Sequence, residues 1–309
     1  MGVCARSRLQ SGSRSSTRAS VSETASPANR YRACVLSTAA ASTLVWLSLV
    51  VAWIVAGLLR RMLLSDLAFD AGRAIESVLT GVMGVLIVVA ACRLLDRRSL
   101  ASLGLGHSRA DLEALLAGAG LWLGLAAVGM AVGAITGTFT VMFGPPTWTM
   151  AGWILFHLFL VFTGEALPEE LALRGYLYTN LAERLPRWAA VLSQAVLFML
   201  WAFALVALLQ VLGGRTGWTI SLDRAILFLT FGTTLALVRL WTGSLWGSVG
   251  FHLAFQTVMG LLGLDRLGVV RVPAEDYGSM GVMLWFFAIV LGGIVASAAL
   301  FRQKGQASS

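Results

Sequence analysis

Eight long apolar segments limit this 309-residue chain to very few folds. Most of them can cross the roughly 30 Å hydrocarbon layer of a bilayer as α-helices, which rise about 1.5 Å per residue. Hydrophobic residues make up 58% of the chain and charged residues only 12%, which excludes an ordinary soluble domain. The sequence therefore predicts an all-α polytopic membrane protein, a bundle of about eight transmembrane helices near residues 34–59, 75–95, 112–135, 150–167, 188–212, 225–241, 245–264 and 279–301.

The basic residues indicate how these segments are oriented. A net charge of +8 could indicate nucleic-acid binding, but the arginines lie at the ends of apolar runs and not on one amphipathic face. Most of the 23 basic residues fall on the side of the membrane where the chain begins and ends. By the positive-inside rule, we expect both termini in the cytoplasm, in a bacterial plasma membrane, and no nucleic-acid partner.

The first 32 residues differ from the rest of the chain. Residues 1–32 are rich in Ser and Arg, contain a single acid, Glu23, and have no apolar period, which predicts a disordered basic tail. A transit peptide or an over-long gene start would have the same composition. Residues 33–309 then form one membrane domain. Cys4, Cys34 and Cys92 have no paired spacing, so no disulfide framework and no cysteine metal site is implied.

Glycine is abundant within the segments and favours close helix packing. The third segment contains Gly118, Gly120, Gly124 and Gly129. Small residues let helix backbones approach closely in lipid, so we expect these four positions to lie at helix contacts.

The stretch GEALPEELALRGY, Gly164–Tyr176, places three carboxylates and an arginine beside the fourth segment. An acidic side chain at the bilayer centre costs about 2.5 to 3.5 kcal/mol on insertion scales, so such a cluster usually has a function. Pro168 lacks a backbone N–H and should kink or end the fourth helix, leaving the carboxylates at a break. The alternative is a solvated helix start at the cytoplasmic interface.

Spacing separates the roles of the two adjacent glutamates. Glu170 and Arg174 are four residues apart with the acid first, the favourable order for a helical ion pair. Glu169 is rotated by about 100° from Glu170, so both cannot face Arg174. Glu169 is left to face the interior of the bundle, where it could act as a general base.

A second polar pair lies in the seventh segment. His252 and Gln256 are four residues apart on one face of an otherwise apolar helix. A lone intramembrane histidine is often a core residue, but a histidine with an amide one turn away indicates a polar site.

These stretches resemble the CPBP intramembrane peptidases, the family that includes CAAX prenyl endopeptidases and bacteriocin-processing and immunity proteins, also called Abi. GEALPEELALRG resembles the family's Glu-Glu-x-x-x-Arg motif, and Gly243–Gln256, GSLWGSVGFHLAFQ, is similar to its third motif, which ends in His-x-x-x-Asn. The run Ser99–Leu105 and the eight-segment layout also fit. The resemblance covers roughly residues 93–264.

The resemblance implies specific roles for matching residues. Glu169 corresponds to the base that activates water, Glu170 and Arg174 to its supporting pair, and His252 to the third-motif histidine. Gln256 stands where the family has asparagine, and its amide could still donate a hydrogen bond.

The second motif departs from the family pattern. In the expected place, Phe198-Met-Leu-Trp-Ala202 puts an alanine where the family has histidine. The chain has only His107, His157 and His252, and none of them lies between Glu169 and His252. Loss of one member of a concerted catalytic group can cost orders of magnitude in rate.

The same residues allow either a metal site or metal-free activation of water. Glu169 and His252, with Glu165 as a further ligand, could form a depleted zinc set, because three protein ligands and a water suit catalytic zinc. No His-Glu-x-x-His helix is present. His157 shares a helix face with Glu165 and Glu169 but would lie about 18 Å from Glu169, so we expect a core histidine bonded to a neighbouring helix.

The sequence is compatible with three functions. The first is an intramembrane endopeptidase, a protease in which a water molecule activated by Glu169 cleaves a membrane-associated protein or peptide. His252 and Gln256 would then polarise the carbonyl or hold the oxyanion. The second is a catalytically silent relative that acts as a membrane binding or immunity protein, for which Ala202 argues. The third is a proton-coupled carrier, but no second broken helix supports it.

Overall fold

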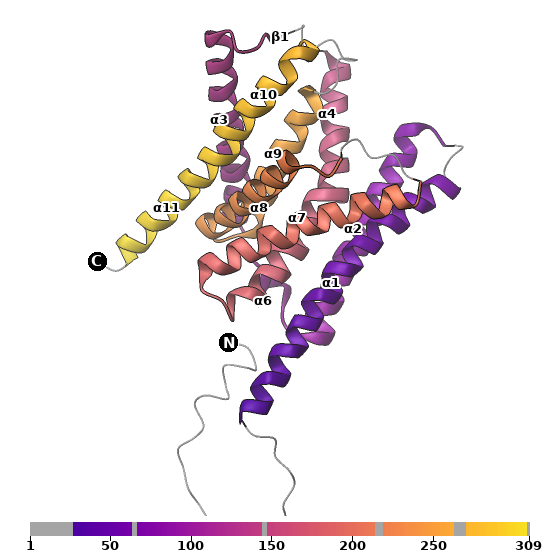
Figure 1. The fold of residues 1–309 in the computed structure, drawn as a ribbon, viewed down its shortest axis with the longest axis vertical. Helices are drawn as coiled ribbons and strands as arrows, with labels where there is room; N and C mark the ends of the chain where they lie inside the picture. Colours follow the sequence, from indigo (N-terminus) through magenta and orange to yellow (C-terminus); the bar gives the residue numbers. More distant parts are fainter. Residues whose placement is uncertain (1–26, 64–66, 144–146, 214–218, 263–269, 308–309) are drawn as a thin grey trace, which may run out of the picture.

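The computed structural model describes residues 27–63, 67–143, 147–213, 219–262 and 270–307. Within these residues, eight helices are long and apolar enough to cross a membrane, by length and composition. The prediction of an all-α bundle of about eight such helices is confirmed (Figure 1). The spans are Ala40–Leu63, Phe69–Leu95, Arg109–Thr136, Trp148–Ala182, Arg187–Val211, Leu222–Thr242, Leu245–Leu262 and Tyr277–Gln303.

Several of these spans consist of more than one helical element. The α-helices are α1 (Pro27–Leu63), α2 (Phe69–Ala90), α3 (Arg109–Thr136), α4 (Trp148–Val161), α5 (Leu167–Glu169), α6 (Tyr178–Ala182), α7 (Arg187–Val211), α8 (Leu222–Thr242), α9 (Leu245–Leu262), α10 (Tyr277–Leu284) and α11 (Gly292–Ala307). The π-helical segments are Ala91–Leu95, Phe162–Ala166, Glu170–Leu177 and Trp285–Leu291, and short 3₁₀ turns span Leu100–Leu103 and Ala274–Asp276. Two-residue strands β1 (Met142–Phe143) and β2 (Val270–Arg271) pair antiparallel.

Helix α1 begins at Pro27, within the end of the predicted basic tail. Residues 1–26, which include Cys4, lie outside the described residues, so the prediction of a disordered tail stays a prediction. Cys92 is buried and unpaired at the end of the second span, in keeping with a cysteine that has no disulfide role.

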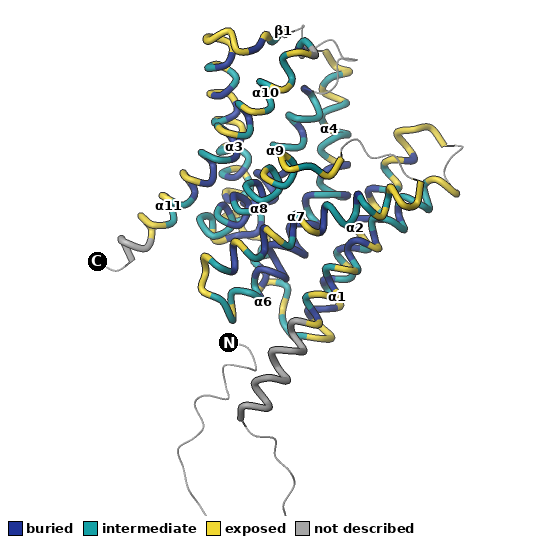
Figure 2. Tube along the Cα trace, viewed as in Figure 1, coloured by how far each residue is buried: buried dark blue, intermediate teal, exposed yellow. Residues whose placement is uncertain are grey.

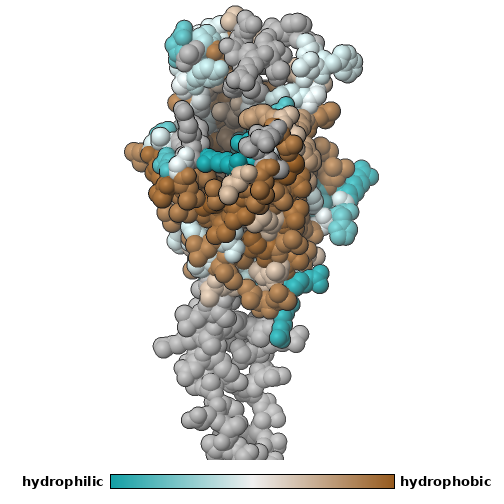
Figure 3. Space-filling view, turned by 90° about the vertical axis from the view of Figure 1, so that its right-hand side faces the viewer, coloured by the Kyte–Doolittle hydropathy of each residue, from teal (hydrophilic) through white to brown (hydrophobic). Residues whose placement is uncertain are grey.

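The outer surface of the bundle is apolar. Leucines such as Leu86 and Leu155 expose more than half of their surface, 60% and 68%, although they lie in the middle of spans. Buried positions concentrate where α7, α8 and α9 meet (Figure 2). A broad apolar surface crosses the middle of one face, with hydrophilic residues beyond its edges (Figure 3). This distribution suits a lipid environment.

The fourth span runs through Pro168 without a break. The prediction that the carboxylates lie at a break in the helix is wrong, because α4, α5 and α6 continue into one another through the π-helical segments as far as Ala182. A π turn pairs each N–H with the carbonyl five residues back. The wider turns on both sides accommodate a proline that has no N–H and whose ring crowds the preceding turn. Glu169 and Glu170 consequently lie inside a continuous membrane helix.

Helices α3 and α9 cross in close backbone contact. A Cβ atom on Gly118 would collide with the Gly247 carbonyl oxygen, and one on Gly250 would collide with the Leu115 carbonyl oxygen. Gly129 packs against the Phe287 ring, where a Cβ would lie 3.0 Å from the Phe287 Cβ. The predicted packing role therefore holds for Gly118 and Gly129 of the third segment.

The packing prediction is wrong for the other two glycines. Among the described residues, no atom of another element lies within 4 Å of a Cβ built on Gly120 or Gly124, because both face away from the helix contacts. The abundance of glycine in a segment does not show which helix face packs.

Hydrogen bonds at one end of the bundle fix the fourth span against α8 and α9. Arg239 of α8 donates to the Leu103 carbonyl oxygen at 3.0 Å, to the Arg174 carbonyl oxygen and to the Thr179 hydroxyl at 3.2 Å. Beside it, the Leu245 N–H at the start of α9 donates to the Gly104 carbonyl oxygen at 3.0 Å. These bonds help to hold together the fourth span, α8 and α9, which carry the polar residues of the interior.

The α3–α9 contact can be tested with one matched pair of variants. Gly118→Val places a branched side chain against the Gly247 backbone, and overpacking of this kind costs about 1 to 3 kcal/mol. We expect the unfolding temperature of the detergent-purified protein to fall clearly for this variant. Gly120→Val, two residues away in open space, should leave it almost unchanged. Equal unfolding temperatures for both variants would contradict the contact.

Candidate active site

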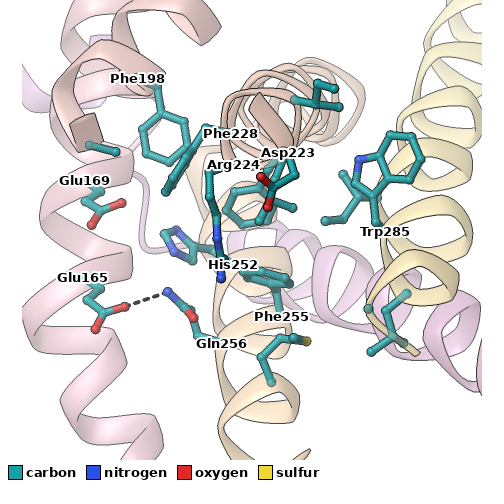
Figure 4. A pocket seen from close by; sticks show the side chains of 18 of the residues that line it. Glu165, Glu169, Phe198, Asp223, Arg224, Phe228, His252, Phe255, Gln256 and Trp285 are labelled. Carbon is teal, nitrogen blue, oxygen red and sulfur yellow. Dashed lines mark hydrogen bonds between the residues drawn. The ribbon is translucent and has the colours of Figure 1, made fainter. Parts of the chain in front are cut away.

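A cavity of about 900 Å³ lies among the membrane spans. Its wall is mostly aromatic and aliphatic, with contributions from Phe198, Phe231, Phe255 and Trp285. A few polar side chains interrupt this wall (Figure 4). They come from the fourth span, α8 and α9, and are Glu165, Glu169, Asp223, Arg224, His252 and Gln256. An apolar pocket with a few convergent polar groups is the usual form of a ligand or active site.

Glu169 reaches this cavity from α5. Its surface is only 7% exposed, and no described residue lies within hydrogen-bonding distance of its carboxylate. Figure 4 shows the carboxylate pointing from the fourth span toward the side where His252 lies. The prediction that Glu169 faces the bundle interior is confirmed, and the alternative of a solvated helix start is wrong for this position.

Glu170 points away from the cavity into a buried ion pair. Arg174 Nη1 donates to Glu170 Oε1 at 3.0 Å, and both side chains are completely buried. The Arg174 guanidinium carbon lies 4.2 Å from the centre of the Phe198 ring. The predicted pairing is confirmed. Removing one partner of such a pair costs about 3 to 5 kcal/mol because the other charge is left buried and alone.

His252 joins this pair from α9. Its Nδ1 lies 3.0 Å from the same Glu170 oxygen, and the residue is 2% exposed. Since an ionised carboxylate only accepts hydrogen bonds, Nδ1 carries a proton in this contact. The other ring nitrogen, Nε2, is then available for chemistry in the cavity that His252 lines. The sequence did not predict this link between Glu170 and His252.

Gln256 is also engaged in a way that spacing did not predict. Its Nε2 donates to Glu165 Oε2 at 2.8 Å across the cavity wall, as the dashed line in Figure 4 shows. The Gln256 backbone carbonyl oxygen lies 3.2 Å from His157 Nε2, and the His157 ring stacks on Trp153. His157 is therefore a core histidine bonded to a neighbouring helix, as expected.

Ala202 lies on α7 in the wall of the same cavity, buried to 3% exposure. The cavity thus joins Glu169, Ala202 and His252, so the position where the family pattern has histidine faces the expected space. A methyl group there can neither accept nor donate a proton.

The residues present do not fit a metal ion. Glu170 binds His252 Nδ1, and Gln256 binds Glu165, so two of the possible donors already have partners. Within the described part of the chain, no three His, Cys, Asp or Glu side chains are arranged to hold a metal. The predicted zinc set of Glu165, Glu169 and His252 is not assembled, and no chemical step is derived through a metal.

Two residues of the cavity wall were missed by the sequence reasoning. Asp223 and Arg224 stand at the start of α8, and neither was among the predicted site residues. Figure 4 shows the Arg224 side chain directed into the cavity. No sequence signal distinguishes such a residue from an ordinary charged helix end.

A family model described as type II CAAX prenyl endopeptidase Rce1-like matches residues 151–258. This stretch runs from α4 to α9 and contains Glu169, the Glu170–Arg174 pair, His252 and Gln256. A comparison with curated proteins finds no match for the chain. The matched family is a protease family, and its model covers the elements that build the cavity. The match supports the resemblance to the CPBP family over these residues, and the eight apolar spans show an integral membrane protein.

Proposed function

We propose that the protein is an intramembrane endopeptidase of the CAAX-protease type that cleaves a membrane-associated protein or peptide. The observation that carries this proposal is the cavity among the membrane spans, which brings the unpaired Glu169 carboxylate and the His252 ring into one apolar space. In such a space, water is scarce and each polar interaction is strong.

Glu169 is the general base of the proposed reaction. Its carboxylate takes a proton from a water molecule as the water oxygen attacks the carbonyl carbon of the scissile bond. The lack of a competing partner leaves both carboxylate oxygens available for this water. Glu170 cannot take this role, because Arg174 and His252 already occupy one of its oxygens and the residue is completely buried.

His252 stabilises the charge that develops on the carbonyl oxygen. In the protonated ring both nitrogens donate, Nδ1 to Glu170 and Nε2 to the oxyanion. Gln256 has two amide hydrogens, and one of them is used by Glu165, so the second can support the same oxygen. The Glu170–Arg174 pair acts by holding the His252 ring in place.

The surroundings of the site define the substrate class. Aromatic and aliphatic side chains form most of the wall, which suits an apolar or membrane-anchored peptide segment. We further propose that both termini lie in the cytoplasm, because the basic residues gather in the links on that side.

Ala202 supports a second candidate function. Without a histidine at this position, the protein would keep the fold but not the catalysis. It would then be a catalytically silent relative that binds a membrane protein or peptide. The two functions differ in one measurable property, which is turnover that depends on Glu169.

Glu169→Ala tests the assigned base. A positioned base contributes about 10²-fold to 10⁴-fold to a rate, so we expect cleavage of membrane-anchored peptides by the purified protein to fall by at least about 100-fold. Glu113→Ala, which removes an exposed carboxylate from α3, is the control and should cleave as wild type does. Equal product from wild type and Glu169→Ala would refute Glu169 as the base.

Ala202→His tests whether the missing histidine limits the reaction. The new imidazole would enter the cavity that Glu169 also lines, so we expect cleavage to rise by about 100-fold, the low end of what a positioned acid or base supplies. Leu205→His places an imidazole in the same wall, one turn further along α7, and should give no increase. Peptide binding by every variant with turnover by none would favour the silent relative.

A further inference from the structure

The cavity contains a second carboxylate that the reaction described above leaves unused. Glu165 lies four residues before Glu169 on the same span, and both line the cavity. Figure 4 shows the two side chains one above the other, each directed into the cavity. Glu169 is more than nine-tenths buried and has no hydrogen-bond partner among the described residues.

Gln256 fixes the position of Glu165. The amide donates to one carboxyl oxygen of Glu165, Oε2, at 2.8 Å, and this bond leaves the second carboxyl oxygen unused (Figure 4). Gln256 is in turn held through its backbone carbonyl by His157 at 3.2 Å. Gln256 of α9 and His157 of α4 therefore hold Glu165 at the edge of the space that a substrate would occupy.

Hydrolysis of an amide needs a proton donor as well as a base, because the leaving nitrogen departs as an amine only when it gains a proton. The position that would supply a second proton-transfer group holds Ala202. Glu165, the second carboxyl group that the fourth span contributes to the cavity, is one helical turn from the base.

We propose that Glu165 is a catalytic residue of this chain, the general acid that protonates the leaving amine in place of the missing histidine. This inference rests on the peptidase function proposed above. It also explains why position 256 holds glutamine where the family pattern has asparagine, since the longer glutamine side chain reaches Glu165.

The proton transfers balance over one turnover. Glu169 takes a proton from water while the water oxygen bonds to the carbonyl carbon and the carbonyl π electrons move to oxygen. The oxyanion electron pair then re-forms the C=O bond as the C–N bond breaks, the C–N electron pair stays on nitrogen, and nitrogen receives the proton of Glu165. The proton held by Glu169 passes to Glu165, which restores the starting pair. The products are a carboxylic acid and an amine.

The other charged groups of the wall are less suited to this step. Asp223 and Arg224 belong to the start of α8, a different span from the one that carries the base (Figure 4). His157 is engaged with the Gln256 backbone and is not among the residues that line the cavity. Glu165 alone among these lies one helical turn from the base.

The test compares an amide with an ester in the same protein. A membrane-anchored peptide is prepared with either an amide or an aryl ester at the scissile bond, because a phenol leaves without the proton that an amine requires. With Glu165→Gln, we expect the kcat for the amide to fall by about 100-fold and that for the ester by less than about threefold. Glu165→Asp, which keeps the acid, should retain part of the amide activity, and Glu113→Gln should change neither rate.

The ratio of amide to ester cleavage within one variant does not depend on how much of the protein is folded. Equal losses for both substrates would show that Glu165 has only a structural role, and no loss for either would overturn the assignment. If wild type cleaves neither substrate, or if Glu169→Gln cleaves both as wild type does, the peptidase function itself fails. That outcome differs from a failure of Glu165 alone, in which cleavage still depends on Glu169.

Discussion

The buried contact between Glu170, Arg174 and His252 determines how the rest of the site is arranged. A guanidinium and an imidazole share one carboxylate oxygen, each at 3.0 Å, with all three side chains almost fully removed from solvent. Each charged group is acceptable in an apolar bundle because the others are present. The contact joins the fourth span to α9 and fixes how these two helices are aligned along their length. The alignment sets the register of the polar face of the fourth span against that of α9. Glu169 and His252 reach the same cavity because of this register.

The continuous fourth span explains why the carboxylates lie deep in the protein. Pro168 would normally interrupt a helix, but the π-helical segments before and after it keep the chain helical as far as Ala182. The glutamates are thereby placed within the bundle and not at a polar helix start. Clusters of π-helical turns are frequently found at functional sites, and here they carry Glu165, Glu170 and Arg174.

The spans, the Glu170–Arg174 pair and the inward direction of Glu169 were predictable, because each follows from spacing within a single helix. The bonds from Glu170 to His252 and from Gln256 to Glu165 were not, because they depend on the relative register of two helices that spacing does not define. Arg224 was missed for a similar reason, since a charge at a helix end can face either solvent or a cavity. Gly120 shows the same limit for packing, because it faces open space while Gly118 touches α9.

In the proposed reaction, water activated by Glu169 attacks a peptide bond inside the membrane bundle. Its most direct test is to supply a membrane-anchored peptide to the purified protein in ¹⁸O-enriched water and to analyse the products by mass spectrometry. We expect the newly formed carboxyl terminus to carry ¹⁸O with wild type, and Glu169→Gln to yield almost no labelled product. An intact peptide with wild type, or equal labelled product from both proteins, would contradict it.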